Sequence, residues 1–328
     1  MHQVKADNQK QHVYSLRMSY TRMADKLRRQ EIIILDGGTG TDIQRRGAPM
    51  SGDTWCADAN LTHPDIVRTV HRDYIRAGSD IITANTFATS PILFSHLGRS
   101  NEIARVDAIA VTLAREATAG TDVCVAGSMS TMRPMATGTD RNNLNFVLSE
   151  RDARTLFQAK ANGLKAFDCD LIMMELMRDT DYAVWASEAA LATGLPVWIG
   201  LSAERGKDGT LQGWGRNDCS FDDIARTLAA LKPAVMMVMH TSPDNTDEAL
   251  AVLRKHWTGP VATYPECGYF KSPDWEFIDV IPPDELVRKS HDWQHLGASI
   301  FGGCCGIGPE YIRPLRDGLP GRVPARRR

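Results

Sequence analysis

The sequence predicts an α/β protein built as a single (β/α)8 barrel, the TIM-barrel architecture, with its active site at the carboxyl ends of the strands. Eight short apolar runs alternate with longer segments of helical period, a pattern typical of parallel strands joined by crossover helices. Nearly every run ends in a polar side chain, as expected where barrel strands carry a site. An open, doubly wound sheet is the alternative fold.

The predicted strands are runs rich in β-branched and aliphatic residues. Two helices between them carry end signals: "HPDIVRTVHRDYIRAG" places Pro64 near a first turn and Gly78 at the C-cap, and Ser220 precedes "FDDIARTLAALKP" as an N-cap. The strands are predicted at residues 31–36, 80–85, 122–128, 170–175, 196–202, 234–240, 260–266 and 297–303.

The two ends of the chain differ in composition from the predicted barrel. Residues 1–28 are polar and charged, and we expect them to form a mobile or peripheral extension. Residues 29–318 form the predicted barrel domain. Residues 319–328 end in "RVPARRR", which we expect to be a solvated basic tail.

The composition points to small-molecule ligands. A net charge of -2 without a basic block argues against nucleic-acid binding. No run approaches the roughly 20 apolar residues of a membrane span, and the start of the chain has no apolar signal core, so we expect a cytoplasmic protein without a membrane partner. The sequence leaves the choice between a monomer and a homo-oligomer open.

Two of the seven cysteines, Cys304 and Cys305, are adjacent in the segment "FGGCCGIG". An odd number of cysteines at irregular spacing argues against a disulfide framework. Neighbouring residues of a regular strand face opposite sides, but the flanking glycines let the chain leave strand geometry and turn both sulfurs inward. This pattern predicts a metal-binding pair, with two small buried thiols as the alternative.

A third metal ligand has two candidates. A catalytic zinc ion takes three protein ligands, with sulfur and nitrogen donors favoured, and keeps one position open. His240 directly follows the apolar strand "AVMMVM", and Cys267 stands in "YPECGYF" at the end of the next strand. A histidine after an apolar run also serves as a packed or capping residue, so the sequence leaves this choice open.

Two carboxylates end predicted strands and are candidates for substrate binding. Asp36 ends the first strand, with Gly37 behind it allowing a ligand to approach the backbone, and Glu175 ends the fourth. A buried carboxylate needs a cation or hydrogen bonds, so the pair suits the ammonium group of an amino acid. Helix capping, or orientation of His240, is the alternative role. Two further strand-end candidates for substrate binding are Asn85 and Ser128.

Other catalytic signatures are missing from the chain. It contains no G-x-S-x-G, H-E-x-x-H or C-x-x-C motif, which argues against serine hydrolases, zincins and thioredoxin-like proteins. The fragment "GTG" lacks a P-loop lysine and therefore does not indicate nucleotide binding.

Three segments resemble the homocysteine S-methyltransferase family, which includes betaine-homocysteine methyltransferase and the homocysteine-binding module of cobalamin-dependent methionine synthase. The segments are "ILDGGTGTDIQRRG", "HPDIVRTVHRDYIRAGSDIITANTF" and "FGGCCGIGPEYI", and the similarity covers residues 31 to 315. The resemblance implies a (β/α)8 barrel in which zinc, held by three cysteines, binds the homocysteine sulfur as a thiolate that attacks a methyl group.

Applied to this chain, the resemblance implies that Cys304 and Cys305 bind zinc and that Asp36 and Glu175 lie near the substrate amino group. The family's remaining zinc cysteine falls at His240, where this chain has histidine. The segment "YPECG" also has a cysteine where the family has a small residue.

The histidine leads to a hypothesis about the methyl donor. Zinc lowers the pKa of a bound thiol, and a neutral imidazole in place of a thiolate makes the complex less negative and the substrate sulfur a weaker nucleophile. We therefore expect an activated sulfonium donor, S-methylmethionine or S-adenosylmethionine, and methionine as the product. A third sulfur from Cys267 would remove this argument. The alternatives are a different thiol acceptor and an inactive homologue that binds an amino-acid thiol.

Overall fold

The computed structural model describes residues 20–135 and 143–322, and all eight predicted strands are present in one parallel sheet. Most are slightly shorter than the apolar runs, because the hydrogen-bonded ladder stops before the polar strand ends. The strands are β1 (Ile33–Ile34), β2 (Ile81–Ala84), β3 (Cys124–Ser130), β4 (Leu171–Met177), β5 (Val197–Leu201), β8 (Val235–Met239), β9 (Val261–Tyr264) and β12 (Ala298–Phe301).

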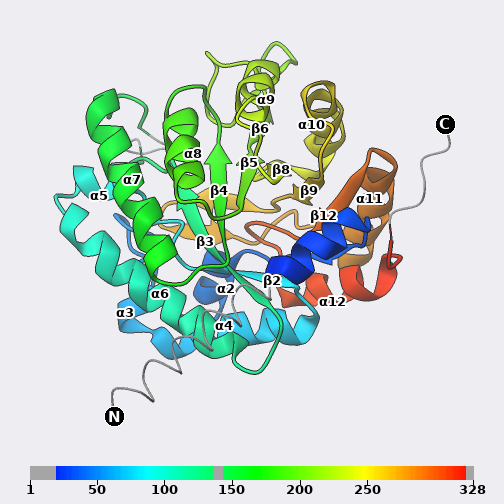
Figure 1. The fold of residues 1–328 in the computed structure, drawn as a ribbon, viewed down its shortest axis with the longest axis horizontal. Helices are drawn as coiled ribbons and strands as arrows, with labels where there is room; N and C mark the ends of the chain where they lie inside the picture. The colour runs from blue at the N-terminus through cyan, green and yellow to red at the C-terminus, as the bar shows by residue number, and fades with distance from the viewer. Residues whose placement is uncertain (1–19, 136–142, 323–328) are drawn as a thin grey trace.

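The order of the strands in the sheet identifies a barrel. Hydrogen-bonded neighbours follow the order β1-β12-β9-β8-β5-β4-β3-β2. From β2 to β12 each barrel strand pairs with the next one along the chain, and the last strand, β12, pairs with the first, β1. A doubly wound sheet would instead place its first strand inside the order. The predicted (β/α)8 TIM barrel is therefore confirmed, as a nearly closed barrel with helices around it (Figure 1).

The helices between the strands carry the end signals predicted for them. Pro64 is the first residue of α4, and Gly78 ends that helix with a left-handed φ of 110°. Ser220 caps α9 by accepting a hydrogen bond from the backbone N–H of Asp223. Residues 20–28 are also helical. The other helices are α2 (Thr39–Arg45), α3 (Ala59–Thr62), α4 (Pro64–Ala77), α5 (Pro91–His96), the 3-10 turn Ser100–Glu102, α6 (Ile103–Thr118), α7 (Glu150–Ala166), α8 (Tyr182–Ala192), α9 (Phe221–Ala229), α10 (Pro243–His256), α11 (Pro283–His295) and α12 (Pro309–Gly318).

Alternate strand residues face the barrel interior and the surrounding helices, as the pleat of a strand requires. In β4, Met173 belongs to the apolar cluster inside the barrel, whereas Met174 belongs to the larger cluster beneath the helices. The inner cluster extends to Cys304 and Cys305. The packed interior therefore leads directly to the cysteine pair.

The helix at residues 20–28 packs against the amino-terminal end of the barrel. Met23 is 1% exposed and belongs to the inner apolar cluster. Trp198, near the start of β5, donates a hydrogen bond from Nε1 to the hydroxyl of Tyr20 over 3.1 Å. The boundaries of the expected extension and tail stay predictions, because parts of both, residues 1–19 and 323–328, lie outside the described residues.

Two antiparallel hairpins interrupt the alternation of strands and helices. The sequence analysis did not predict them, because their strands are only three residues long and are largely polar. They follow β5 and β9 and consist of β6 (Ala203–Arg205) with β7 (Leu211–Gly213), and β10 (Tyr269–Lys271) with β11 (Asp274–Glu276).

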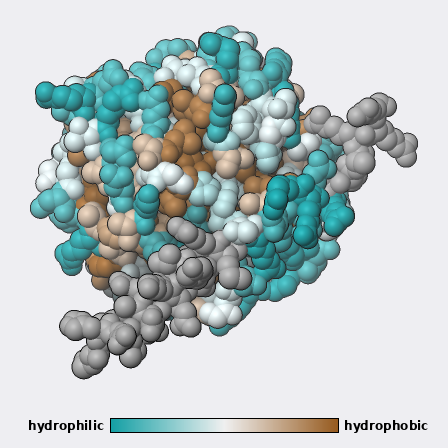
Figure 2. Space-filling model, in the orientation of Figure 1, coloured by the Kyte–Doolittle hydropathy of each residue, from teal (hydrophilic) through white to brown (hydrophobic). Residues whose placement is uncertain are grey.

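Hydrophilic residues cover most of the molecular face shown in Figure 2, with apolar residues visible mainly between them. Among the described residues, no helix is both long enough and apolar enough to cross a membrane.

The side chain of Asp80 links β1 and β2, the two strands at the ends of the barrel sheet. The backbone N–H of Asp80 donates to the carbonyl of Ile34 over 2.7 Å, and the Asp80 carboxylate accepts from the N–H of Ile34 over 2.9 Å. The same carboxylate pairs with Lys26, at 2.6 Å, and with Arg316. Asp80 therefore joins β1 to the segment before β2 and ties both to the first and last described helices.

We predict that Asp80→Ala lowers the free energy of unfolding by about 2–3 kcal/mol, since it removes a hydrogen-bonded charge and leaves two cations without their partner. Asp122→Ala is the matched control, because Asp122 is 78% exposed and pairs with Arg22, which is 52% exposed, so its loss should cost less than about 1 kcal/mol. Urea unfolding of both variants measures the difference. Equal losses would show that Asp80 does not hold the ends of the sheet together.

Candidate metal centre and substrate cavity

The glycine turn after β12 directs the adjacent cysteines toward the barrel mouth. Gly306 has a left-handed φ of 81°, and a Cβ there would lie 1.9 Å from the carbonyl oxygen of Cys267. The turn is joined to the loop after β9, because Cys304 donates its N–H to Pro265 over 2.7 Å and Cys305 accepts from Cys267 over 2.9 Å. Close contact between the two loops therefore requires glycine at this position.

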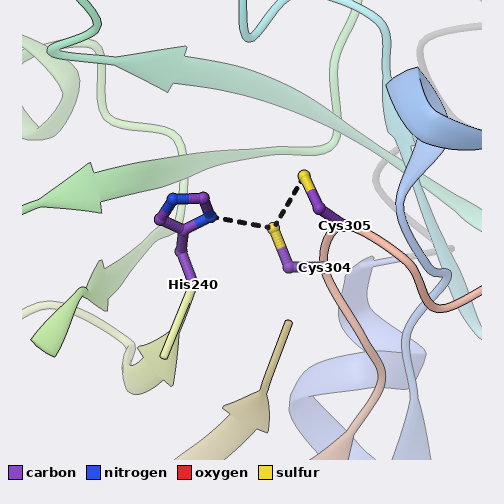
Figure 3. Close-up of side chains that lie close together, drawn as sticks. All are labelled: His240, Cys304 and Cys305. Atoms are coloured by element: carbon purple, nitrogen blue, oxygen red, sulfur yellow. Dashed lines mark hydrogen bonds between the residues drawn. The ribbon is translucent and has the colours of Figure 1, made fainter. Parts of the chain in front are cut away.

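His240 projects toward the same point from the end of β8. Its backbone has a left-handed φ of 43°, a rare conformation for a residue with a Cβ and one that is concentrated at functional sites. Its N–H donates to the carbonyl of Tyr264 over 3.1 Å, and its ring packs edge-on against Trp214 with centroids 4.8 Å apart. Figure 3 shows the imidazole directed at the sulfur of Cys304.

These three residues fit a metal ion. One ligand atom each from His240, Cys304 and Cys305 lies within 4.8 Å of the others. The two sulfurs are 3.9 Å apart, and Nδ1 of His240 is 3.7 Å from Sγ of Cys304. Tetrahedral zinc with ordinary bond lengths would separate two sulfurs by about 3.8 Å and a nitrogen and a sulfur by about 3.6 Å. The donor set thus suits zinc with a fourth position open.

Cys267, the other candidate for third ligand, is not part of this group. It is buried and lines the cavity, and burial raises the pKa of its thiol to about 11. Of the two candidates considered from the sequence, the structure brings His240 together with the cysteine pair.

Glu266 is a residue of the centre that the sequence analysis did not select. Its Oε2 lies 2.6 Å from Nδ1 of His240. Burial opposes a charge on His240, but the Glu266 carboxylate and the neighbouring Cys304 outweigh it and raise the imidazole pKa to about 10. Without metal the ring is therefore protonated, and a metal ion must displace that proton to bind there. In the sequence, Glu266 could have been selected because it stands at the end of a predicted strand, next to Cys267.

Asp36 is fully buried behind the cavity wall. Its carboxylate accepts hydrogen bonds from the N–H and hydroxyl of Thr83 and, over 2.9 Å, from the hydroxyl of Tyr264. Burial raises its pKa to about 6, against the opposite effect of these bonds. Thr83 and Tyr264 themselves line the cavity, so Asp36 acts on its contents through them. The sequence analysis did not select Thr83 or Tyr264, because their hydrogen bonds to Asp36 join different strands of the barrel.

Glu175 lines the cavity directly and is 6% exposed. Burial raises its pKa to about 7; the neighbouring Ser128 counteracts this rise, and the charge of Asp36 adds to it. Ser128 is fully buried and does not line the cavity, and among the described residues its hydroxyl has no hydrogen-bond partner. A cationic group in the cavity would favour the ionised form of both acids.

Gly37 and Asn85 both line the cavity, in different ways. A Cβ on Gly37 would lie 2.1 Å from the carbonyl oxygen of Ile307, so only glycine fits there. The amide of Asn85 donates to the carbonyl of Cys56 over 3.0 Å and to the side chain of Asn60 over 3.1 Å. Asn85 therefore fixes its own loop, and its amide is engaged within the protein.

The cavity has a volume of about 490 Å³ and contains the cysteine pair, His240, Glu175 and Glu266 in its lining. The unpredicted β10–β11 hairpin forms one wall. Aromatic rings whose faces attract cations line much of the remainder: Trp55, Phe87, Trp214, Tyr269, Phe270 and Trp275.

Comparisons with known proteins identify the family of this chain. The family model described as homocysteine S-methyltransferase matches residues 33–319. The betaine-homocysteine S-methyltransferase 1 of Danio rerio is 26% identical over 314 residues, covering 90% of this chain and 74% of the relative. Homocysteine S-methyltransferase 1 of Zea mays is 25% identical over 323 residues, covering 88% and 95%.

Among solved structures, the metallated form of the homocysteine methyltransferase MmuM from Escherichia coli has a similar fold. Its TM-score is 0.73 at 22% identity, and the match covers 92% of this chain and all of that chain. The family model spans nearly the whole barrel, from β1 to the end of α12. The chain therefore belongs to the homocysteine S-methyltransferase family.

Proposed function

We propose that this enzyme transfers a methyl group to the thiol of homocysteine and so forms methionine. Family membership supports the reaction. The observation that carries it to this chain is the group of His240, Cys304 and Cys305, whose ligand atoms lie within 4.8 Å of one another at the barrel mouth. A family member that had lost the reaction would not need to retain such a group beside a cavity.

The metal that we propose for this group is zinc, since two sulfurs and an imidazole nitrogen are its preferred donors. Bound zinc lowers the pKa of a coordinated thiol and so keeps the substrate sulfur reactive near neutral pH. The protein's own contribution is to hold the three donors in place. The interlocked loops fix the two cysteines, and the end of β8 fixes His240.

The amino group of homocysteine is assigned to Glu175, with Asp36 behind it. Glu175 faces the cavity and is nearly desolvated, so an ammonium group can replace the water that it lacks. Asp36 accepts hydrogen bonds from the hydroxyls of Tyr264 and Thr83 and so holds both residues in place at the cavity wall. Ser128 favours the ionised form of Glu175, Gly37 gives a ligand access to the backbone, and Asn85 holds the cavity wall.

The methyl donor is proposed to be a sulfonium compound, either S-methylmethionine or S-adenosylmethionine. The argument from the sequence compared an imidazole with a thiolate, but Glu266 adds a negative charge beside His240 and offsets that difference. The proposal rests instead on the cavity, where aromatic rings and carboxylates lie together. The rings suit any methylated cation, betaine included, but the carboxylates favour a donor with a net positive charge over zwitterionic betaine. A cation over such rings is stabilised by about 0.5–2 kcal/mol. A cytoplasmic location and the oligomeric state stay predictions.

Removal of His240 should abolish the reaction. We predict that His240→Ala lowers zinc affinity more than about 100-fold, since loss of a direct ligand exceeds the about 10- to 100-fold cost of losing an outer partner. Zinc per chain by elemental analysis and homocysteine methylation should fall together. His295→Ala, on the exposed end of α11, is the control. A variant that keeps both zinc and turnover would remove His240 from the centre.

The methyl donor can be assigned by comparing the rates of homocysteine methylation with each candidate donor. We predict faster homocysteine methylation with S-methylmethionine or S-adenosylmethionine than with betaine at equal concentration. Methionine formation, measured by mass spectrometry with each donor, gives the order. Faster turnover with betaine would contradict the sulfonium assignment. Binding of homocysteine without turnover on any donor would identify an inactive homologue.

We expect the Glu175 carboxylate to lower the free energy of unfolding and to promote the binding of homocysteine. Its folded-state pKa of about 7 exceeds the ordinary 4.5, so the native protein holds more protons than the unfolded chain between these values. Stability from this group is therefore present below pH 4.5 and is lost as the pH rises through 7. Relative to wild type, Glu175→Gln should gain about 2–3 kcal/mol between pH 5 and pH 8.

Urea unfolding of the metal-free proteins across this range tests the gain, and calorimetric titration with homocysteine should show binding weakened at least about 10-fold, the equivalent of one lost charged contact. Parallel stability curves for the two proteins would show that Glu175 is not held in a raised pKa.

A further inference from the structure

A buried ion pair lies behind the loop that follows β2. It joins Lys160 of α7 to Asp107 of α6, with Nζ of Lys160 2.9 Å from Oδ2 of Asp107 and side chains that are 0% and 2% exposed. Burial lowers the pKa of Lys160 and raises the pKa of Asp107, so it opposes both charges. Apolar residues of similar volume often stabilise a protein as well as a buried ion pair does. Packing of the two helices therefore does not explain why this position carries charges.

The ammonium group of Lys160 also binds the loop. Its Nζ donates to the carbonyl of Thr86 over 3.0 Å, to the carbonyl of Thr89 over 3.2 Å and to the hydroxyl of Thr89 over 2.7 Å. The hydroxyl of Thr89 also contacts the carboxylate of Asp107. A backbone carbonyl only accepts hydrogen bonds, so an apolar side chain at position 160 would remove a donor from both. The turn from Thr86 to Thr89 is thus held around one buried cation.

This turn carries part of the cavity wall. Asn85 and Phe87 line the cavity, one on each side of Thr86, whereas Lys160 does not line it. The ring of Phe87 packs edge-on against Trp55 with centroids 6.1 Å apart, and Trp55 packs in the same way against Phe270 at 6.4 Å. An effect of Lys160 on a bound ligand must therefore pass through the loop and its aromatic ring.

The other side of the loop is tied to β3. The hydroxyl of Thr86 donates to the carbonyl of Ser128 over 2.9 Å, and the hydroxyl of Ser130 donates to the carbonyl of Phe87 over 2.7 Å. These bonds come from the barrel, whereas those of Lys160 come from the surrounding helices. Phe87 is therefore held from two sides, and loss of Lys160 would leave only the bonds to β3.

We propose that Lys160 is a positioning residue for the methyl donor, because it holds the turn from Thr86 to Thr89 and, with it, the ring of Phe87. This role rests on the proposed function, in which the aromatic rings of the cavity receive a sulfonium cation. A ring attracts a cation only when its face lies within about 6 Å of the charge, so a loop that shifts should weaken donor binding. The cysteine pair, His240 and Glu175 come from other strands, so zinc and homocysteine should bind as before.

The test compares Lys160→Met with Arg115→Met in the full-length protein. Arg115 of α6 donates to the carbonyl of Asp168 over 3.0 Å and pairs with the buried Asp170 over 2.9 Å, directly before β4 and outside the cavity lining. Each variant therefore removes a cation that binds a carbonyl and a buried carboxylate, but at opposite ends of the barrel.

Methionine formation is measured at saturating homocysteine with S-methylmethionine and with S-adenosylmethionine. We expect Lys160→Met to raise the KM of the donor that is turned over by about 2- to 30-fold, the range of one cation contact with a ring. The kcat, the zinc content and the calorimetric affinity for homocysteine should keep their wild-type values. Arg115→Met should leave the KM of the donor unchanged.

A double-mutant cycle tests whether Lys160 acts through the ring. Phe87→Leu keeps an apolar side chain but removes the ring, so adding Lys160→Met to it should raise the KM of the donor no further. If Lys160→Met alone does not fold, its combination with Asp107→Leu leaves no unpaired buried charge and takes its place in each comparison.

Three results would overturn the role of Lys160. They are an unchanged KM of the donor, an equal rise in Arg115→Met, and rises in Lys160→Met and Phe87→Leu that multiply in the double variant. Joint loss of zinc, homocysteine and donor binding would indicate a general structural role and would overturn it as well. Turnover by wild type with a normal KM in Lys160→Met would reject only this role, whereas a wild type without turnover on either donor would reject the proposed function too.

Discussion

Two adjacent cysteines can face one cavity only where the chain abandons the extended conformation, and the rest of the site depends on the turn that achieves this. Gly306 takes a backbone conformation and a close contact that a larger residue could not. The turn is then fixed by two hydrogen bonds to the loop after β9, one from Cys304 and one to Cys305. Because the same loop carries Glu266, the bonds that place the sulfurs also place the carboxylate beside His240.

The barrel mouth concentrates groups that would be unfavourable elsewhere. Two acids with raised pKa and a histidine in a left-handed conformation lie around one cavity. Each reduces the stability of the free protein, and each becomes favourable when a metal ion or an ammonium group is present. The apolar interior of the barrel and the helix beneath it supply the rigidity that holds this arrangement. Stability and function are thus located at opposite ends of the same strands.

The sequence predicted the fold well because the fold depends on local patterns. Apolar runs marked all eight strands, and Pro64, Gly78 and Ser220 marked helix ends where the structure has them. The hairpins escaped prediction because three-residue polar strands leave no periodic signal. Contacts between strands also escaped it: the bond from Tyr264 to Asp36 joins residues 228 positions apart.

Residue type alone was also a partial guide to the site. The polar end of β2 marked Asn85 as a cavity residue, but only the structure shows that its amide is already engaged by Cys56 and Asn60. The sequence left the choice between His240 and Cys267 open, and the distance to the cysteine pair separates them.

X-ray absorption at the zinc edge tests the central claim most directly, because it counts the sulfur ligands. For a centre built from His240, Cys304 and Cys305, it should show two sulfurs together with lighter donors in the protein alone, and three sulfurs after homocysteine is added. Three sulfurs before any homocysteine is present, or no bound zinc, would contradict this account.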